Sequence, residues 1–179
     1  MIKPIIVTFS GQARHGKSVS AEILGELLTE KGFRVMIAAY SDYMQFLLKQ
    51  YKGWDGKKDE NGRALLNYIG SEIGRAKNPD FWVNNLVQLI ELWQNDYDFI
   101  LISGCRFENE ITRWQDEGYR VFPIHVERLN FVSELTEDQK KHPSENSLKT
   151  FCFTRSLKAE NLHDLKTELK NKVLPLITE

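Results

Sequence analysis

The sequence predicts a three-layer α/β domain in which helices cover both faces of a parallel sheet. Its 179 residues match the size of one domain that buries a proper core. Short apolar runs alternate with longer segments of helical period along most of the chain. Strands that are separated by helices pair in parallel, because a crossover helix returns the chain to the same end of the sheet.

The composition excludes several classes of protein. The 24 Lys and Arg residues balance 25 Asp and Glu residues, so no general basic field predicts nucleic-acid binding. No apolar run approaches the roughly 20 residues that span a bilayer. The segment 1–4 lacks the layout of a signal peptide, and Cys105 and Cys152 lack metal-ligand spacing. We therefore expect a cytoplasmic protein without a structural zinc or a membrane partner.

Five short apolar runs are the candidate strands of the sheet. They cover residues 5–9, 35–40, 98–103, 120–126 and 150–154. The run at 5–9 is continuously apolar and bounded by glycine, as suits a buried parallel strand, and DFILIS at 98–103 is the least ambiguous strand of the chain.

Helices are expected between these runs, over about 17–31, 42–51, 63–76, 80–95, 108–117 and 161–174. The first places apolar residues at helical spacing and is followed by Gly32, as a C-terminal cap would be. Pro79 opens the fourth. Residues 128–148 are polar and charged and show no clear period.

The turn after the first strand carries the strongest functional motif. The stretch GQARHGKS fits G-x-x-x-x-G-K-[ST], in which curled backbone N–H groups and a helix N-terminus bind phosphate. We expect Lys17 to reach the β- and γ-phosphates of ATP and Ser18 to offer its hydroxyl to Mg²⁺. Arg14 and His15 either contact phosphate or are solvated loop residues. The expected ATP contacts are Gly11, Ala13, Arg14, His15, Gly16, Lys17, Ser18 and Val19.

Further motifs follow in a characteristic order: SDYM (41–44), GRALLNYIGSEIGR (62–75), NPDFWV (78–83), RFENEI (106–111) and HPSENSL (142–148). Together with the phosphate loop they resemble the deoxynucleoside monophosphate kinases of bacteriophages, a branch of the nucleoside monophosphate kinase-like P-loop proteins. The resemblance runs over nearly the whole chain. It implies a five-stranded, adenylate kinase-like P-loop NTPase fold in a single domain over 1–179. It also implies a helical substrate-binding insert at about 42–95 and a lid at about 128–148.

The same resemblance implies roles for individual residues. Those that would bind the acceptor nucleotide are Asp42, Arg63, Arg75, Trp82, Glu110, His142 and Glu145, with Ser144 also on the lid side. Those that would carry the phosphoryl transfer are Lys17, Arg106, Arg128 and Asp42.

The positions of two arginines support these roles independently. Arg106 and Arg128 each follow a predicted strand, at the sheet edge where open α/β folds bind ligands. For each arginine the alternative is a surface ion pair, and for Trp82 it is packing in the core. Gly104 stands where the family usually carries an aspartate that helps to hold Mg²⁺.

The function that these features predict is ATP-dependent phosphoryl transfer to a (deoxy)nucleoside monophosphate, which yields the diphosphate. One alternative keeps the kinase fold and changes the acceptor, for example to a hydroxymethylated pyrimidine, free or in DNA. Another is a catalytically weak nucleotide-binding subunit. The expected partner is a small-molecule nucleotide, and nucleic acid is a partner only if the acceptor is a pyrimidine in DNA. The chain is expected to be a monomer or homodimer. Its expected location is the cytoplasm, which is the host cytoplasm if the source is viral.

Overall fold

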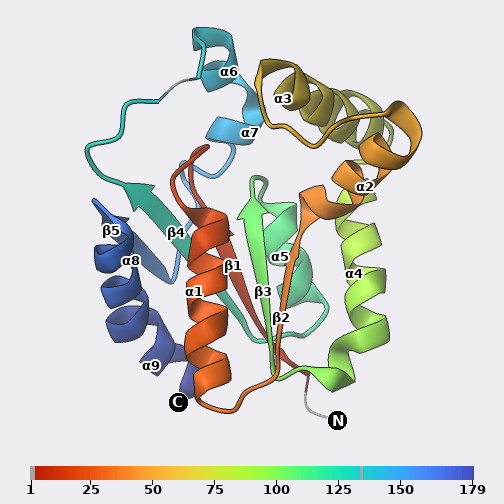
Figure 1. Ribbon diagram of the computed structural model, residues 1–179. Coiled ribbons are helices and arrows are strands. Elements are labelled where there is room, and N and C mark those ends of the chain that lie inside the picture. The colour runs from red at the N-terminus through yellow and green to blue at the C-terminus, as the bar shows by residue number, and fades with distance from the viewer. Residues whose placement is uncertain (1–2, 134) are drawn as a thin grey trace. The chain divides into compact units, whose positions relative to one another are not determined.

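Five parallel strands form one sheet in the order β2-β3-β1-β4-β5 (Figure 1). The computed structural model describes residues 3–133 and 135–179. The strands are β1 (Ile5–Ser10), β2 (Val35–Ala39), β3 (Phe99–Cys105), β4 (Val121–Arg128) and β5 (Arg155–Ala159). Helices cover both faces of this sheet, which confirms the predicted three-layer α/β/α P-loop fold.

The central strand β1 pairs with β3 on one side and with β4 on the other. Ile5 lies opposite Phe99, and Ile6 lies opposite Val121. β1 and β3 are buried along most of their length, which for β1 confirms the prediction from its continuous apolar run. Because all three strands run in parallel, their carboxyl ends meet at one edge of the sheet.

The predicted last strand at 150–154 is wrong, and β5 follows it instead, over Arg155–Ala159. The rings of Phe151 and Phe153 pack against each other, with centroids 5.0 Å apart, and Phe153 also packs against His125. The strand itself buries only alternate residues, such as Leu157. The aromatic segment therefore has the stronger apolar signal in the sequence, although the half-exposed edge strand lies just after it.

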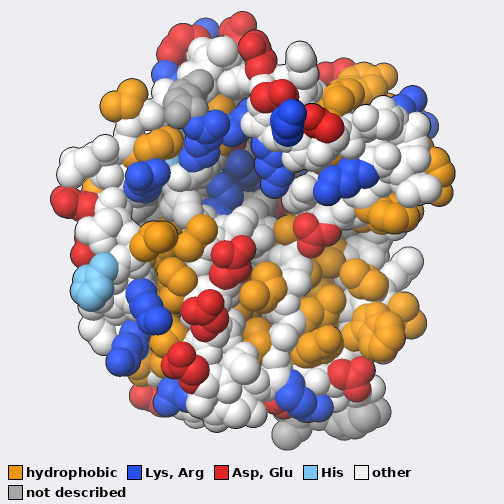
Figure 2. All heavy atoms as spheres, in the orientation of Figure 1, with side chains coloured by type: hydrophobic (Ala, Val, Ile, Leu, Met, Phe, Trp, Pro, Cys, Tyr) orange, Lys and Arg blue, Asp and Glu red, His pale blue; other side chains and the backbone are white. Residues whose placement is uncertain are grey.

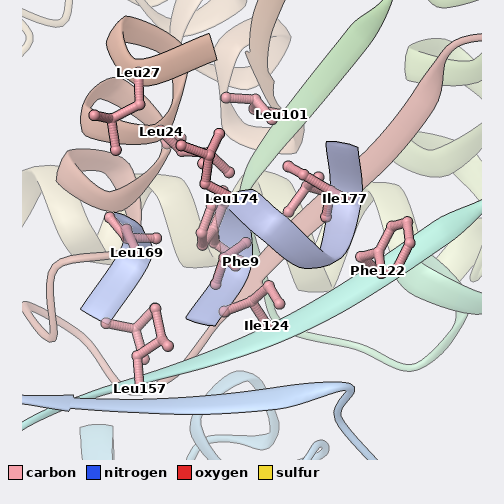
Figure 3. Close-up of a cluster of buried hydrophobic side chains, with 14 of the residues drawn as sticks. Phe9, Leu24, Leu27, Leu101, Phe122, Ile124, Leu157, Leu169, Leu174 and Ile177 are labelled. Carbon is pink, nitrogen blue, oxygen red and sulfur yellow. The ribbon is translucent and has the colours of Figure 1, made fainter. Parts of the chain in front are cut away.

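One face of the sheet is covered by α1 (Lys17–Glu30) together with α8 (Leu162–Glu168), the π-helical η3 (Leu169–Val173) and α9 (Leu174–Thr178). Figure 3 shows the core between these helices and the strands, where Phe9, Leu24 and Leu169 are fully buried. Each such side chain contributes about 1.5–3 kcal/mol through burial. This packing fixes the N-terminal end of α1 at the carboxyl end of β1.

The opposite face is covered by α5 (Asn109–Asp116), whose Ile111 and Trp114 are fully buried. The short 3-10 helix η2 (Gln94–Asp96) precedes β3. Residues 128–148, whose sequence shows no clear period, include two short helices, α6 (Glu137–Lys141) and α7 (Pro143–Asn146).

The chain divides into two compact units, and the second, Ala39–Leu92, consists of helices. They are α2 (Tyr40–Lys52), α3 (Glu60–Asn67), the π-helical η1 (Tyr68–Arg75) and α4 (Phe81–Trp93). The single helix expected over 63–76 is thus an α-helix that continues as a π-helix. No helix in the described parts of the chain has the length and apolar character needed to cross a membrane.

Candidate functional site

The loop between β1 and α1 curls tightly because two glycines adopt backbone conformations that side chains rarely permit. Gly11 has φ 141°, and a Cβ at this position would lie 2.2 Å from the carbonyl oxygen of Val126. Gly16 has φ 94° and forms the N-cap of α1. Arg14 between them also has a positive φ, of 63°. A loop of this shape at the N-terminus of a 14-residue helix provides N–H groups for an anion.

Lys17 lies within this loop and not on the protein surface. Its side chain is buried, and its Nζ donates to the carbonyl oxygens of Gly11 at 2.9 Å and Gln12 at 2.6 Å. Burying an ammonium group is costly unless an acceptor or an anion compensates its charge. Ser18, the next residue, is exposed at the start of the helix. Lys17, the predicted phosphate ligand, is thus buried within the loop, and Ser18, the predicted Mg²⁺ ligand, is exposed beside it at the start of α1.

A carboxylate from α7 reaches the same loop. Glu145 accepts a hydrogen bond from the backbone N–H of Ala13 at 2.9 Å. Its other oxygen forms an ion pair with the guanidinium of Arg106, which also donates to the carbonyl oxygen of Ser144 at 3.3 Å. The Glu145 and Arg106 side chains are 10% and 24% exposed. The structure therefore brings two predicted site residues from distant parts of the chain onto the phosphate loop.

Glu110 holds the turn that carries Arg106. Its side chain is 2% exposed, and its carboxylate accepts the backbone N–H groups of Arg106 at 2.5 Å and Phe107 at 3.2 Å. These bonds fix the start of the turn between β3 and α5. The resemblance implied that Glu110 binds the acceptor, which stays a prediction, and the structure adds a backbone-holding role.

Arg128, the last residue of β4, lies beside the loop through His15. Its backbone N–H donates to Nδ1 of His15 at 3.2 Å, and its guanidinium lies 4.9 Å from the ring centroid of Phe131. The His15 ring meets the same phenyl ring edge-on. Burial, and then the charge of Lys17, lowers the pKa of His15 below its usual value. His15 is therefore packed into the site, whereas Arg14 is exposed.

Gly104 is explained by an irregularity in the sheet. Ser103 pairs with Phe9, but the next pair joins Cys105 to Ser10, so Gly104 is an extra residue in β3. It has φ 78°, which favours glycine, and a Cβ there would meet no atom within 4 Å. Gly104, where the resemblance led us to expect an aspartate, thus forms a bulge at the carboxyl end of β3.

A cavity of about 100 Å³ lies beside the loop and is lined by Gln12, Arg106, His125 and Lys149, among others. Sequence reasoning named only Arg106 of these four. The signal for His125 was its position in the otherwise apolar run FPIHV. Burial lowers the pKa of His125, and burial raises the pKa of the neighbouring Cys105 thiol well above its usual value. The thiol is therefore protonated at neutral pH and is no nucleophile.

Asp42 and Trp82 lie in the helical unit. Asp42 is in the first turn of α2, where its carboxylate accepts the backbone N–H of Ala39 at 2.8 Å. Trp82 is 2% exposed, and its indole N–H donates to the carbonyl oxygen of Gly70 at 2.9 Å. Both side chains thus have structural roles within this unit, and their roles toward an acceptor stay predictions.

Arg63 and Arg75 in the helical unit are partly buried, and both donate to backbone carbonyls among their contacts. Arg63 donates from Nε to Lys58 at 3.0 Å, and Arg75 donates from Nη1 to Pro79 at 3.0 Å. Their roles in holding an acceptor phosphate stay predictions.

His142 forms the N-cap of α7, where Nδ1 accepts the backbone N–H of Ser144 at 3.2 Å.

In Figure 2, lysine and arginine side chains gather above the N-terminal end of α1, where Figure 1 draws the loop. Within residues 3–133 and 135–179, no group of three or more His, Cys, Asp or Glu side chains is arranged to hold a metal ion.

Comparison with known proteins shows the fold. No protein-family model matches the sequence, and no curated protein matches it. Among solved structures, the APS kinase CysC of Mycobacterium tuberculosis in complex with AMPPNP and APS is similar over 100% of both chains, with a TM-score of 0.57 and 13% identity. A Cys556Ala mutant of that kinase gives a TM-score of 0.53 at 14% identity, again over 100% of both chains. The likeness establishes that this chain has the fold of these kinases.

Proposed function

We propose that this protein is a kinase that transfers the γ-phosphoryl group of ATP to the phosphate of a (deoxy)nucleoside monophosphate. The observation that carries the proposal is the loop between β1 and α1, in which the buried Lys17 ammonium lies against the carbonyls of Gly11 and Gln12. This combination of curled backbone and enclosed cation suits a polyphosphate chain.

The residues of the loop fit ATP and Mg²⁺. The Val126 carbonyl oxygen lies where a Cβ of Gly11 would be, so only glycine lets the loop turn against β4 there and keep its curled path. Ser18 is exposed at the start of α1 and would hold Mg²⁺ through its hydroxyl. When bound, Mg²⁺ neutralises charge on the β- and γ-phosphates.

The chain's own contribution would be positioning and charge neutralisation. In the proposed reaction an oxygen of the acceptor phosphate attacks the γ-phosphorus, the bond from that phosphorus to the bridging β–γ oxygen breaks, and ADP leaves. The acceptor oxygen is already deprotonated at neutral pH, so no strong general base is needed. Lys17 and Arg106 would stabilise the charge that moves from the γ-phosphate toward ADP.

Support for a nucleotide acceptor comes from the motifs that resemble phage deoxynucleoside monophosphate kinases. Arg63 and Arg75, both partly buried, belong to the motif that binds acceptor phosphate in that family. The similar APS kinase structure contains AMPPNP, which supports an ATP-type donor for this chain as well.

The experiment that tests this function follows labelled γ-phosphate from Mg-ATP to a panel of ribo- and deoxyribonucleoside monophosphates. We expect labelled diphosphate with at least one of them. Lys17→Ala should abolish transfer, whereas Lys172→Ala, which changes an exposed lysine paired with Glu168, should leave the rate unchanged. Label on plain or hydroxymethylated DNA, or ATP binding without transfer, would contradict the proposed acceptor.

A further inference from the structure

The carboxylate of Glu145 lies where the phosphate loop offers an anion partner. The Ala13 N–H, 2.9 Å from one carboxylate oxygen, belongs to the segment between Gly11 and Gly16. The Arg106 guanidinium forms an ion pair with the other oxygen. One backbone N–H and one guanidinium thus converge on a single negative group, which is how proteins bind phosphate.

The HPSEN segment is built to direct this carboxylate. His142 caps α7, and Pro143 occupies the first helical position, which suits its fixed φ. The Asn146 side chain donates to the carbonyl oxygens of Lys140 at 2.7 Å and His142 at 3.0 Å, so it joins α7 to α6. These contacts place the Ser144 carbonyl and the Glu145 carboxylate together on Arg106.

We propose that the Ala13 N–H and Arg106 form an anion subsite for which Glu145 and a nucleotide phosphate compete. The inference rests on the proposed function, because it takes the loop to be a nucleotide site. A carboxylate and a phosphate cannot share one N–H and one guanidinium without strong repulsion between like charges. Nucleotide binding therefore displaces Glu145, which releases α7 and leaves Arg106 to pair with the phosphate.

This competition lowers the apparent affinity for nucleotide. Suppose that a ligand binds only to molecules in which Glu145 has left the subsite. Its apparent dissociation constant is then the intrinsic constant divided by the fraction of molecules in that open state. If Glu145 occupies the subsite about nine-tenths of the time, removing its charge tightens binding about tenfold. A contact that merely stabilised the fold would not tighten binding when it is removed.

The test compares Glu145→Gln with the wild type in titrations with Mg-ATP and, separately, with inorganic triphosphate. Both probes should bind the variant about three- to tenfold more tightly. The matched control is Glu137→Gln, which removes the same charge from α6, where Glu137 pairs with Lys140 and is 76% exposed. The control should bind both probes as the wild type does.

A second measurement needs no nucleotide. Hydrogen exchange of a peptide that covers residues 137–149 should be faster in Glu145→Gln than in the wild type and unchanged in Glu137→Gln. Equal exchange in Glu145→Gln and the wild type would overturn the proposal.

The results separate this inference from the function on which it rests. Tighter binding to Glu145→Gln supports both. Binding of ATP to the wild type with equal or weaker binding to the variant overturns the competition but leaves the nucleotide site intact. Failure of all three proteins to bind either probe overturns the proposed function and the competition with it.

Discussion

Replacing Glu110 by alanine removes the carboxylate that holds the turn between β3 and α5. That carboxylate is almost fully buried and accepts the backbone N–H groups of Arg106 and Phe107. Alanine supplies no acceptor, so both N–H groups lose a charged partner in a half-buried turn. The side chain of Arg106 then starts from a less fixed backbone position.

The expected cost follows from these two bonds. A hydrogen bond to a charged group contributes about 1.5–3 kcal/mol, and a buried donor left without a partner costs about 1–3 kcal/mol. Because Arg106 and Phe107 are only partly buried and water can replace part of the loss, we expect Glu110→Ala to lower the free energy of unfolding by about 3 kcal/mol. Glu110→Gln retains one acceptor oxygen without the charge and should cost about half as much.

Urea denaturation followed by circular dichroism measures these free energies. The matched control is Glu108→Ala, two residues earlier, where an exposed glutamate is removed and the change should stay within about 0.5 kcal/mol. A loss below about 0.5 kcal/mol for Glu110→Ala would refute the reasoning that the carboxylate holds the turn. Equal losses for Glu110→Ala and the control would refute it as well.

Two further predictions concern the loop and its histidine. Gly11→Ala places a Cβ 2.2 Å from a backbone carbonyl oxygen, so it should abolish ATP binding and destabilise the fold. The control is Gly32→Ala, at a position with φ 88° where no atom lies within 4 Å of a Cβ, and it should lower the free energy of unfolding by less. Equal unfolding free energies of the two variants would contradict this reasoning. Burial lowers the pKa values of His15 and His125, so their neutral forms stabilise the fold above the usual value of 6.5, and this contribution is lost as the pH falls through the lowered values. Unfolding free energies measured between pH 7.5 and pH 5 should therefore fall less steeply for the His15→Gln/His125→Gln variant than for the wild type, and parallel curves would contradict the assignment.

The central part of the fold and the phosphate loop could be predicted from the sequence because their signals are local. The buried run of β1 leads directly into Gly11, whose close approach to Val126 admits no side chain. The helix that follows begins at Lys17, as the motif requires. Here the residue types themselves determine the backbone path, so a single sequence is sufficient.

The edge of the sheet could not be predicted in the same way. β5 alternates buried and exposed residues and is only five residues long, so its apolar signal is weaker than that of the aromatic segment before it. The bulge at Gly104 also left no local signal, because an extra residue in a parallel strand is visible only when the partner's register is known.

The contact between Ala13 and Glu145 joins residues that are 132 positions apart. The resemblance assigned Glu145 to the lid side of the site, but no periodicity or spacing indicated that its carboxylate reaches the phosphate loop. Likewise, the packing of His15 against Arg128 and Phe131 depends on a chain path that only the structure gives. Long-range polar contacts of this kind determine the detailed chemistry of the site.

Calorimetric titration of the wild-type protein with Mg-ATP tests the central claim most directly, since it asks only whether the loop around Lys17 binds a triphosphate. We predict saturable binding at one site, and a loss of at least about a hundredfold in affinity for Lys17→Ala, whose removed ammonium would otherwise contact the phosphates. No binding to the wild type, or equal binding to both proteins, would contradict the account.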